Sequence, residues 1–304
     1  MRNFLYTVGL ATVILLNAAV VRASNEVYYT NLNNLDMTEQ QYQNLLNQGF
    51  TEEQISRMDE NEFQENKDVE ATLVSENKKY MRMRTHLING IKYTTSSVLS
   101  EEEYHEALLQ ANNPIHTRNI QGDYYDGDFW DEIFEIVTRI ANINDDVFRY
   151  KLDVYWDTMP TDKYYDIMGI GFNANKIHIG SGISFREDWQ TYSDVFDYLT
   201  DCYPKSESTG GSVIFELPDV STSSLKNMSQ YMYFYVVKNA NVGTLSQIEA
   251  AGGYAHATAY YDPEETNGLY YNYTVNLGGI DIDSPYRSHY NIVGPVIGYF
   301  VGNW

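Results

Sequence analysis

The two residues best suited to covalent chemistry are Cys202 and His256. Cys202 is the only cysteine of the chain, and a thiol hydrolase needs a cysteine activated by a histidine that is distant in sequence. The chain order agrees with such a pair. However, Pro204 follows closely, and no helix is expected there to lower the thiol pKa. A thiol protease or amidase is therefore the alternative function, and a small apolar packing residue is the simpler interpretation of Cys202.

Aromatic side chains on two expected strands between residues 229 and 261 suggest a different kind of site. In the first strand, three tyrosines alternate with Met232, Phe234 and Val236, so the tyrosines share one face. Tyrosine suits a wet sheet face because its ring packs against neighbours while its hydroxyl stays hydrated. This face is either an ordinary solvated surface or a stacking platform for a sugar, a polymer or a partner. The candidate ligand-binding residues are Tyr231, Tyr233, Tyr235, Tyr254, His256 and Tyr260.

Acidic residues gather in the stretch GDYYDGDFWDE, where Asp123, Asp126 and Asp128 lie within six positions. Calcium prefers dense oxygen ligands, but this spacing differs from that of the EF-hand loop. An ordinary acidic loop in which Asp128 caps a following helix is the simpler interpretation. Calcium at these residues is the one cofactor hypothesis.

Two catalytic or cofactor motifs are incomplete. His105 and Glu106 begin a helical HE pair, but Leu109 stands where a zinc protease needs its second histidine. The pattern G-x-G-x-x-A at residues 169–174 is followed by an expected strand, so no helix N-terminus is available to hold a pyrophosphate. These departures argue against a zinc protease and a dinucleotide-binding protein.

The first 23 residues have the pattern of a secretory signal peptide. Arg2 precedes a long apolar run, and Val21 and Ala23 form an A-x-A-like cleavage site before Ser24. An uncleaved membrane anchor is the alternative, because the apolar run approaches the length that spans a bilayer. We expect a secreted, extracellular protein that contacts the membrane only through this segment before cleavage.

The chain is strongly acidic, with a formal net charge of −22. Loss of residues 1–23 would remove Arg2 and Arg22 and bring the net charge to −24. Such a surface repels nucleic acid and anionic lipid, so we expect no nucleic-acid partner. A cell-wall polymer, a glycan or a protein partner remains compatible with this charge.

The expected fold class is α+β, with a small helical and hairpin region at residues 24–119. Thr38 and Thr51 each begin a capping box, and Asp59 begins a third helix, which predicts a compact three-helix unit over residues 37–67. Residues 70–98 predict a β-hairpin because Asn89-Gly90 suits a tight turn. A capped helix follows from Ser100 onward.

Residues 120–304 are expected to form an antiparallel β-sandwich or jelly-roll-like domain with a leading helix at 129–142. That helix is predicted from the 3.6-residue spacing of its apolar side chains. Short alternating runs with turns between them then predict strands from Phe148 onward, interrupted by a short helix at 189–199.

As a whole, the chain resembles uncharacterised secreted proteins of Gram-positive bacteria. The resemblance is carried by the signal peptide, by MTEQQYQNLLNQGFTEEQI, and by HLINGIKYTTSSVLSEEEYHEALL. It implies export and no particular activity. The sequence therefore predicts a secreted, tyrosine-rich, non-catalytic binding or structural protein, with the thiol hydrolase as the alternative.

Overall fold

The computed structural model describes residues 26–89, 91–111, 129–221, 224–243, 247–260, 273–277, 280–284 and 288–301. The expected signal peptide, residues 1–23, and the calcium candidates Asp123, Asp126 and Asp128 lie outside these ranges. Within the described residues, no helix combines the length and the apolar content that a bilayer span requires.

The N-terminal part is a small helical unit, which we define as residues 27–67. It consists of β1 (Tyr29–Thr30), β2 (Asp36–Met37), α1 (Glu39–Asn47), α2 (Glu52–Arg57) and α3 (Glu60–Asn66). The capping boxes at Thr38 and Thr51 are confirmed, since each hydroxyl accepts the N3 amide and each glutamine reaches back. Asp59 caps α3. Gly49 ends the first helical segment at φ +90°, a conformation that favours glycine.

A large antiparallel sheet forms the centre of the molecule, in the order β10-β9-β13-β6-β5-β3-β4, with β8 pairing to β13. Its strands are β3 (Thr72–Ile88), β4 (Ile91–Leu99), β5 (Phe129–Asn144), β6 (Val147–Trp156), β8 (Ile177–Ile179), β9 (Ser184–Thr191), β10 (Phe196–Leu199) and β13 (Leu225–Lys238). The outer face is covered at one end by α4 (Glu101–Ala111), through Tyr104 and Ala107, and elsewhere by the helical unit.

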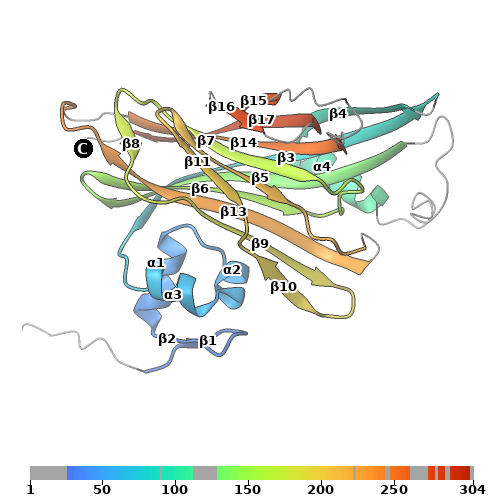
Figure 1. Ribbon diagram of the computed structural model, residues 1–304. Coiled ribbons are helices and arrows are strands. Elements are labelled where there is room, and N and C mark those ends of the chain that lie inside the picture. Colours follow the sequence, from blue (N-terminus) through green and yellow to red (C-terminus); the bar gives the residue numbers. More distant parts are fainter. Residues whose placement is uncertain are drawn as a thin grey trace, which may run out of the picture.

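A second antiparallel sheet packs on the inner face, in the order β11-β12-β7-β14-β17. Its strands are β7 (Tyr165–Gly171), β11 (Tyr203–Glu207), β12 (Gly210–Glu216), β14 (Gln247–Tyr260) and β17 (Ser288–Val301), and β15 (Tyr273–Leu277) pairs with β16 (Ile280–Ser284) beyond them. Figure 1 shows the resulting stack of helical unit, large sheet, second sheet and β15–β16 hairpin. Both sheets are open, and all described strand pairs are antiparallel.

The main core lies between the two sheets, where alternate residues of each strand point inward. Phe134, Trp156 and Phe234 of the large sheet meet Met168 and Tyr254 of the second sheet. The sheets are also joined by a hydrogen bond that the Thr138 hydroxyl donates to the Val296 carbonyl at 2.9 Å. The sandwich-like arrangement expected for the C-terminal part is therefore present.

The helix expected at residues 129–142 is wrong, because this segment is β5. Its residues are buried on both faces: Phe134 and Ile136 lie in the main core, while Ile133 packs under α4. A strand buried on both faces loses the polar–apolar alternation, so its apolar residues also match a helical spacing. The short helix expected at 189–199 is likewise wrong, since β9 and β10 form a hairpin there.

The expected hairpin is confirmed, with Ile88 pairing to Ile91 and Asn89 at φ 52°. The boundary expected near residue 120 is not a structural division, because β3 pairs with both β4 and β5 in one sheet. The hairpin therefore belongs to the large sheet, and the helical unit is the segment that stands apart.

Candidate binding site at the open edge of the sheets

The solvated aromatic face expected on β13 is wrong, because the helical unit covers it. Tyr231 and Tyr233 are only 0% and 4% exposed, and both rings contact the edge of Phe50. The Tyr231 hydroxyl donates to Glu62 at 2.8 Å, and the Asn66 amide donates to the Tyr233 hydroxyl at 3.1 Å. Tyr231 and Tyr233 therefore form part of the surface on which the helical unit packs. Tyr235, the third tyrosine of this face, is half-buried.

The docking surface beneath the helical unit is rich in buried charge. The Arg149 guanidinium is fully buried, donates to Gln48 at 2.5 Å and to Asn66 at 2.8 Å, and stacks 3.6 Å from the centre of the Tyr233 ring. Nearby, Lys151 pairs with the Asp153 carboxylate. Burial lowers the pKa of Lys151 to about 7, despite that pairing. This network fixes the helical unit in one orientation.

Tyr254 and His256 point into the sandwich and are fully buried, so the surface role expected for them is also wrong. Asp166 of β7 accepts hydrogen bonds from the Tyr254 hydroxyl, from the His256 ring at Nδ1 (2.9 Å), and from the Ala257 amide (2.9 Å). The side chain of Tyr260, at the end of β14, lies outside the described part of the structure.

His256 lies between two buried carboxylates. Its Nε2 atom is 3.7 Å from Glu132, whose other oxygen accepts from the amide and hydroxyl of Thr161. Burial disfavours the charged ring, but the carboxylates of Asp166 and Glu132 outweigh burial and raise the pKa of His256 to about 9. His256 is therefore a cation inside the core at neutral pH.

We expect stability to decrease with rising pH through this histidine. Because its pKa is raised from 6.5 to about 9 on folding, its contribution is complete below about pH 6.5 and is lost as pH rises through about 9. This pKa difference between the folded and the unfolded protein corresponds to about 3 kcal/mol of stability. Urea unfolding of the protein and of His256→Gln should therefore differ less at alkaline than at acidic pH. A pH-independent difference would contradict the assignment.

The thiol hydrolase hypothesis is contradicted by the positions of its two residues. Cys202 immediately precedes β11, while His256 lies in β14, and β12 and β7 separate these strands. Three strand spacings place the two backbones roughly 14 Å apart. Burial and the charge of Asp201 raise the pKa of the Cys202 thiol to about 11, the reverse of what a nucleophile requires.

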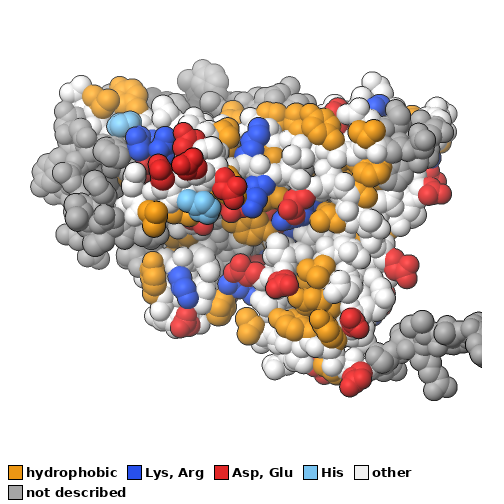
Figure 2. All heavy atoms as spheres, turned by 180° about the vertical axis from the view of Figure 1, so that it is seen from behind, with side chains coloured by type: hydrophobic (Ala, Val, Ile, Leu, Met, Phe, Trp, Pro, Cys, Tyr) orange, Lys and Arg blue, Asp and Glu red, His pale blue; other side chains and the backbone are white. Residues whose placement is uncertain are grey.

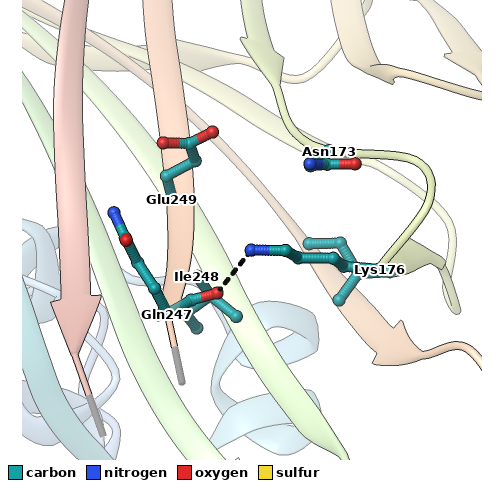
Figure 3. A pocket seen from close by; sticks show the side chains of 6 residues that line it. Asn173, Lys176, Gln247, Ile248 and Glu249 are labelled. Atoms are coloured by element: carbon teal, nitrogen blue, oxygen red, sulfur yellow. Dashed lines mark hydrogen bonds between the residues drawn. The ribbon is translucent and has the colours of Figure 1, made fainter. Parts of the chain in front are cut away.

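A small polar pocket lies at one end of the sandwich, between the turn after β7 and the start of β14. Figure 3 shows Lys176 reaching across it to donate to the Gln247 carbonyl, a contact of 3.3 Å, with Asn173 and Glu249 nearby. Its volume is about 100 Å³. Ligand pockets commonly measure about 300–1,000 Å³, so this one suits a few waters rather than a sugar ring.

Exposed aromatic residues lie instead along the edges at which the two sheets end, with Phe196 and Tyr198 on the helical-unit side of β10 and Tyr203 on the opposite side of the sandwich in β11. Tyr192 is 70% exposed and Tyr203 is 54% exposed, while Phe196 and Tyr198 are 44% and 42% exposed. We call this surface, residues 192–203, the open aromatic edge. The chain crosses here from the large sheet to the second sheet.

The rings of β10 lie beside the helical unit, and cations hold them there. The Arg57 guanidinium of α2 lies 4.5 Å from the Phe196 ring, and that of Arg186 lies 4.0 Å from the Tyr198 ring. Arg186 also donates to Asp59 at 2.8 Å and to the Arg57 carbonyl at 2.7 Å. The open aromatic edge is therefore positioned by both the sheet and the helical unit.

A second group of exposed apolar residues lies on the helical unit itself. Figure 2 shows hydrophobic side chains gathered on the lower lobe of the molecule, which this unit forms. The most exposed are Val27, Tyr28 and Leu32. Tyr28 contacts the Tyr42 ring at a centroid distance of 5.5 Å, so this group partly packs on itself.

The helix predicted for residues 189–199 does not place these rings at a sheet edge, so this prediction does not indicate the open aromatic edge. One signal could have revealed it: Phe196 and Tyr198 alternate with Asp197 and Leu199, which is the two-residue period of a strand.

The fold defines a two-sheet antiparallel β protein with a docked helical unit. No family model matches this chain, and no curated protein matches it. Comparison with solved structures does give matches, and those described below have low sequence identity.

One similar structure is the pilus backbone protein RrgB of Streptococcus pneumoniae, with 10% identity and a TM-score of 0.29 over 52% of this chain and 44% of that chain. The C-terminal domain of the AgI/II polypeptide BspA of Streptococcus agalactiae matches at 10% identity and a TM-score of 0.28, covering 61% of this chain and 75% of that one. The KRT10-binding region domain of the pneumococcal serine rich repeat protein PsrP matches at 8% identity and a TM-score of 0.24, covering 40% of this chain and 77% of that one.

These similar structures are surface and pilus proteins of streptococci. This chain spans less than half of the RrgB chain that it matches. At such identities and scores, the site has to be interpreted from this chain's own residues.

Proposed function

We propose that the protein is secreted and non-catalytic, and that it binds a cell-surface polymer, glycan or protein partner through the open aromatic edge. The observation that carries this proposal is the series of exposed rings along the two edge strands and the turn before them, at Tyr192, Phe196, Tyr198 and Tyr203. Exposed tyrosines supply large contact areas at a small entropic cost, and they are common among residues that dominate binding energy.

Two further features support an extracellular binding role. The N-terminal sequence has the pattern of a signal peptide. The aromatic and histidine residues inside the sandwich are used for packing and for a buried ion pair, whereas the rings at the edge are exposed to a partner.

We expect the double variant Tyr192→Ser/Tyr203→Ser to lower the affinity of the protein for Gram-positive cells and wall fractions by about thirtyfold, since each of the two lost ring contacts is worth about 1 kcal/mol. Pull-down with the full chain measures this. Tyr28→Ser/Tyr93→Ser is the matched control. These tyrosines are similarly exposed, at 55% and 49%, but lie outside the open aromatic edge. Equal retention of the two double variants would refute the proposed surface.

A further inference from the structure

The strand β10 is the last strand of the large sheet, and no strand in the described part of the chain pairs with its outer side. The amide of Thr191 donates to the Val195 carbonyl at 2.9 Å, which makes these two residues a hydrogen-bonded pair. Pairing alternates along an antiparallel ladder, so the backbone groups of Phe196 and Tyr198 point away from β9. The outer side of β10 therefore presents two N–H and two C=O groups.

The side chain of Asp197 currently caps one of these groups. The Tyr198 amide donates to the Asp197 carboxylate at 2.9 Å, which agrees with an outward-pointing N–H. An added strand would place a carbonyl oxygen where this carboxylate now lies. The displaced carboxylate would then need another partner, and a lysine or arginine of the incoming strand could supply it.

The other sheet edges carry residues that hinder strand addition. β11 contains Pro204 and Lys205, β17 contains Pro295, and β4 contains Lys92. Proline cannot donate to a ladder, and lysine on an edge strand opposes pairing with a neighbouring chain. β10 reads Phe-Asp-Tyr-Leu and pairs with β9 without a bulge, so it contains neither proline nor lysine. Its length of four residues and the charge of Asp197 limit strand addition there.

The charge around β10 favours a cationic partner. Asp194, Asp197 and Asp201 are exposed within eight residues. The nearby cations are already engaged: Arg57 pairs with Glu53 at 2.7 Å, Arg186 pairs with carboxylates of the helical unit and of β9, and Lys226 pairs with Asp194 at 3.5 Å. Asp197 and Asp201 are therefore the carboxylates that a cationic partner would meet. The chain as a whole has a net charge of −22.

The same charges oppose pairing with a second copy of this chain. The antiparallel register that uses all four outward groups pairs Phe196 of each copy with Tyr198 of the other. That register places the two Asp197 side chains directly opposite each other, and like charges in this position destabilise a sheet. A second copy is therefore a poor occupant of this edge.

We infer that β10 takes an extended, lysine- or arginine-rich segment of a partner protein as an added antiparallel strand. Backbone hydrogen bonds to Phe196 and Tyr198 provide affinity, and the carboxylates beside them select the charge of the partner. The inference rests on the proposed function and specifies its partner class.

The probe is a synthetic eleven-residue peptide in which lysine alternates with threonine and valine, compared with peptides that carry glutamate or glutamine in place of lysine. Fluorescence anisotropy with the full-length protein measures binding. We expect the lysine peptide to bind at least about thirtyfold more tightly than the glutamate peptide, with an affinity that decreases as salt increases.

The variant Tyr198→Pro removes the outward N–H without removing a hydrogen bond to β9, and Tyr198→Val removes the ring but keeps the N–H. We expect the proline variant to bind the lysine peptide about tenfold more weakly than the valine variant, because one backbone hydrogen bond is lost. Matching melting temperatures for the two variants establish that both are folded.

The variant Asp197→Ala tests the role of the carboxylate separately, in a protein whose strand backbone is unchanged. It should weaken binding of the lysine peptide about fivefold and strengthen binding of the glutamine peptide, since the cap on the Tyr198 amide is gone. Equal effects on both peptides would overturn the proposed selection by charge.

Three results overturn strand addition: no binding of the lysine peptide, equal affinity of the proline and valine variants, or a dimer in sedimentation that Tyr198→Pro abolishes. If Tyr198→Pro is still retained on cells while Tyr192→Ser/Tyr203→Ser is not, the proposed function stands and the strand inference fails. If neither variant loses retention, the proposed function itself fails.

Discussion

Replacing Asp166 with alanine should lower the free energy of unfolding by about 5 kcal/mol, a large part of what a domain possesses. Asp166 is fully buried and accepts hydrogen bonds from the Tyr254 hydroxyl, the His256 ring and the Ala257 amide. Its removal leaves a buried imidazolium facing only Glu132, together with two donors that have lost their acceptor. An uncompensated buried charge and unsatisfied donors are each costly.

Graded variants separate charge from shape in this result. Asp166→Asn keeps the size of the side chain and one acceptor oxygen. We therefore expect its free energy of unfolding to decrease by about half as much as that of the alanine variant. Asp201→Ala removes an exposed carboxylate and should change stability by less than about 0.5 kcal/mol. Urea unfolding followed by tryptophan fluorescence measures all three. A loss for Asp166→Ala no larger than that of Asp201→Ala would show that the buried network contributes little.

Replacing Arg149 with alanine should release the helical unit from the large sheet at a cost of about 4 kcal/mol. The guanidinium is buried between the Tyr233 and Phe50 rings and donates to the side-chain oxygens of Gln48 and Asn66. Alanine leaves both acceptors buried without that donor and opens a cavity beneath Phe50. The loss is localised at the interface, so the sandwich itself should remain folded.

Hydrogen exchange and limited proteolysis can detect this release. Amides of α1, α2 and α3 should exchange at least about a hundredfold faster in Arg149→Ala, while those of β5 and β6 keep their protection. Arg149→Lys retains the charge but not the planar fork. Its helix amides should therefore exchange at rates between those of the unaltered protein and those of Arg149→Ala. Lys226→Ala, which removes an exposed cation from β13, is the control. Unchanged exchange in the helices would refute the role of Arg149.

Local sequence signals were enough for several elements of this fold. The caps at Thr38, Thr51 and Asp59 and the turn at Asn89 depend on contacts within a few residues, and each is found where the sequence placed it. The strand-rich character of the second half also followed from short alternating runs. These features are local, so no knowledge of distant contacts was needed.

The β5 segment shows where local signals stop being sufficient. Its apolar residues satisfy a helical period as well as a strand period, because both of its faces are buried. The choice between helix and strand is decided by pairing with β3 on one side and β6 on the other. The sequence of the segment does not show these contacts. The error at residues 189–199 has a different cause, since β10 is exposed and its two-residue period is visible in the sequence.

The sequence alone determined that Tyr231, Tyr233 and Tyr235 share one face of a strand and that Met232, Phe234 and Val236 share the other. Only the tertiary structure decided which faces meet water. The helical unit, more than 160 residues earlier in the chain, covers Tyr231 and Tyr233 through contacts with Glu62 and Asn66. A period of two specifies two sides of a strand, but burial of a side depends on what packs against it, and that is settled by the whole chain.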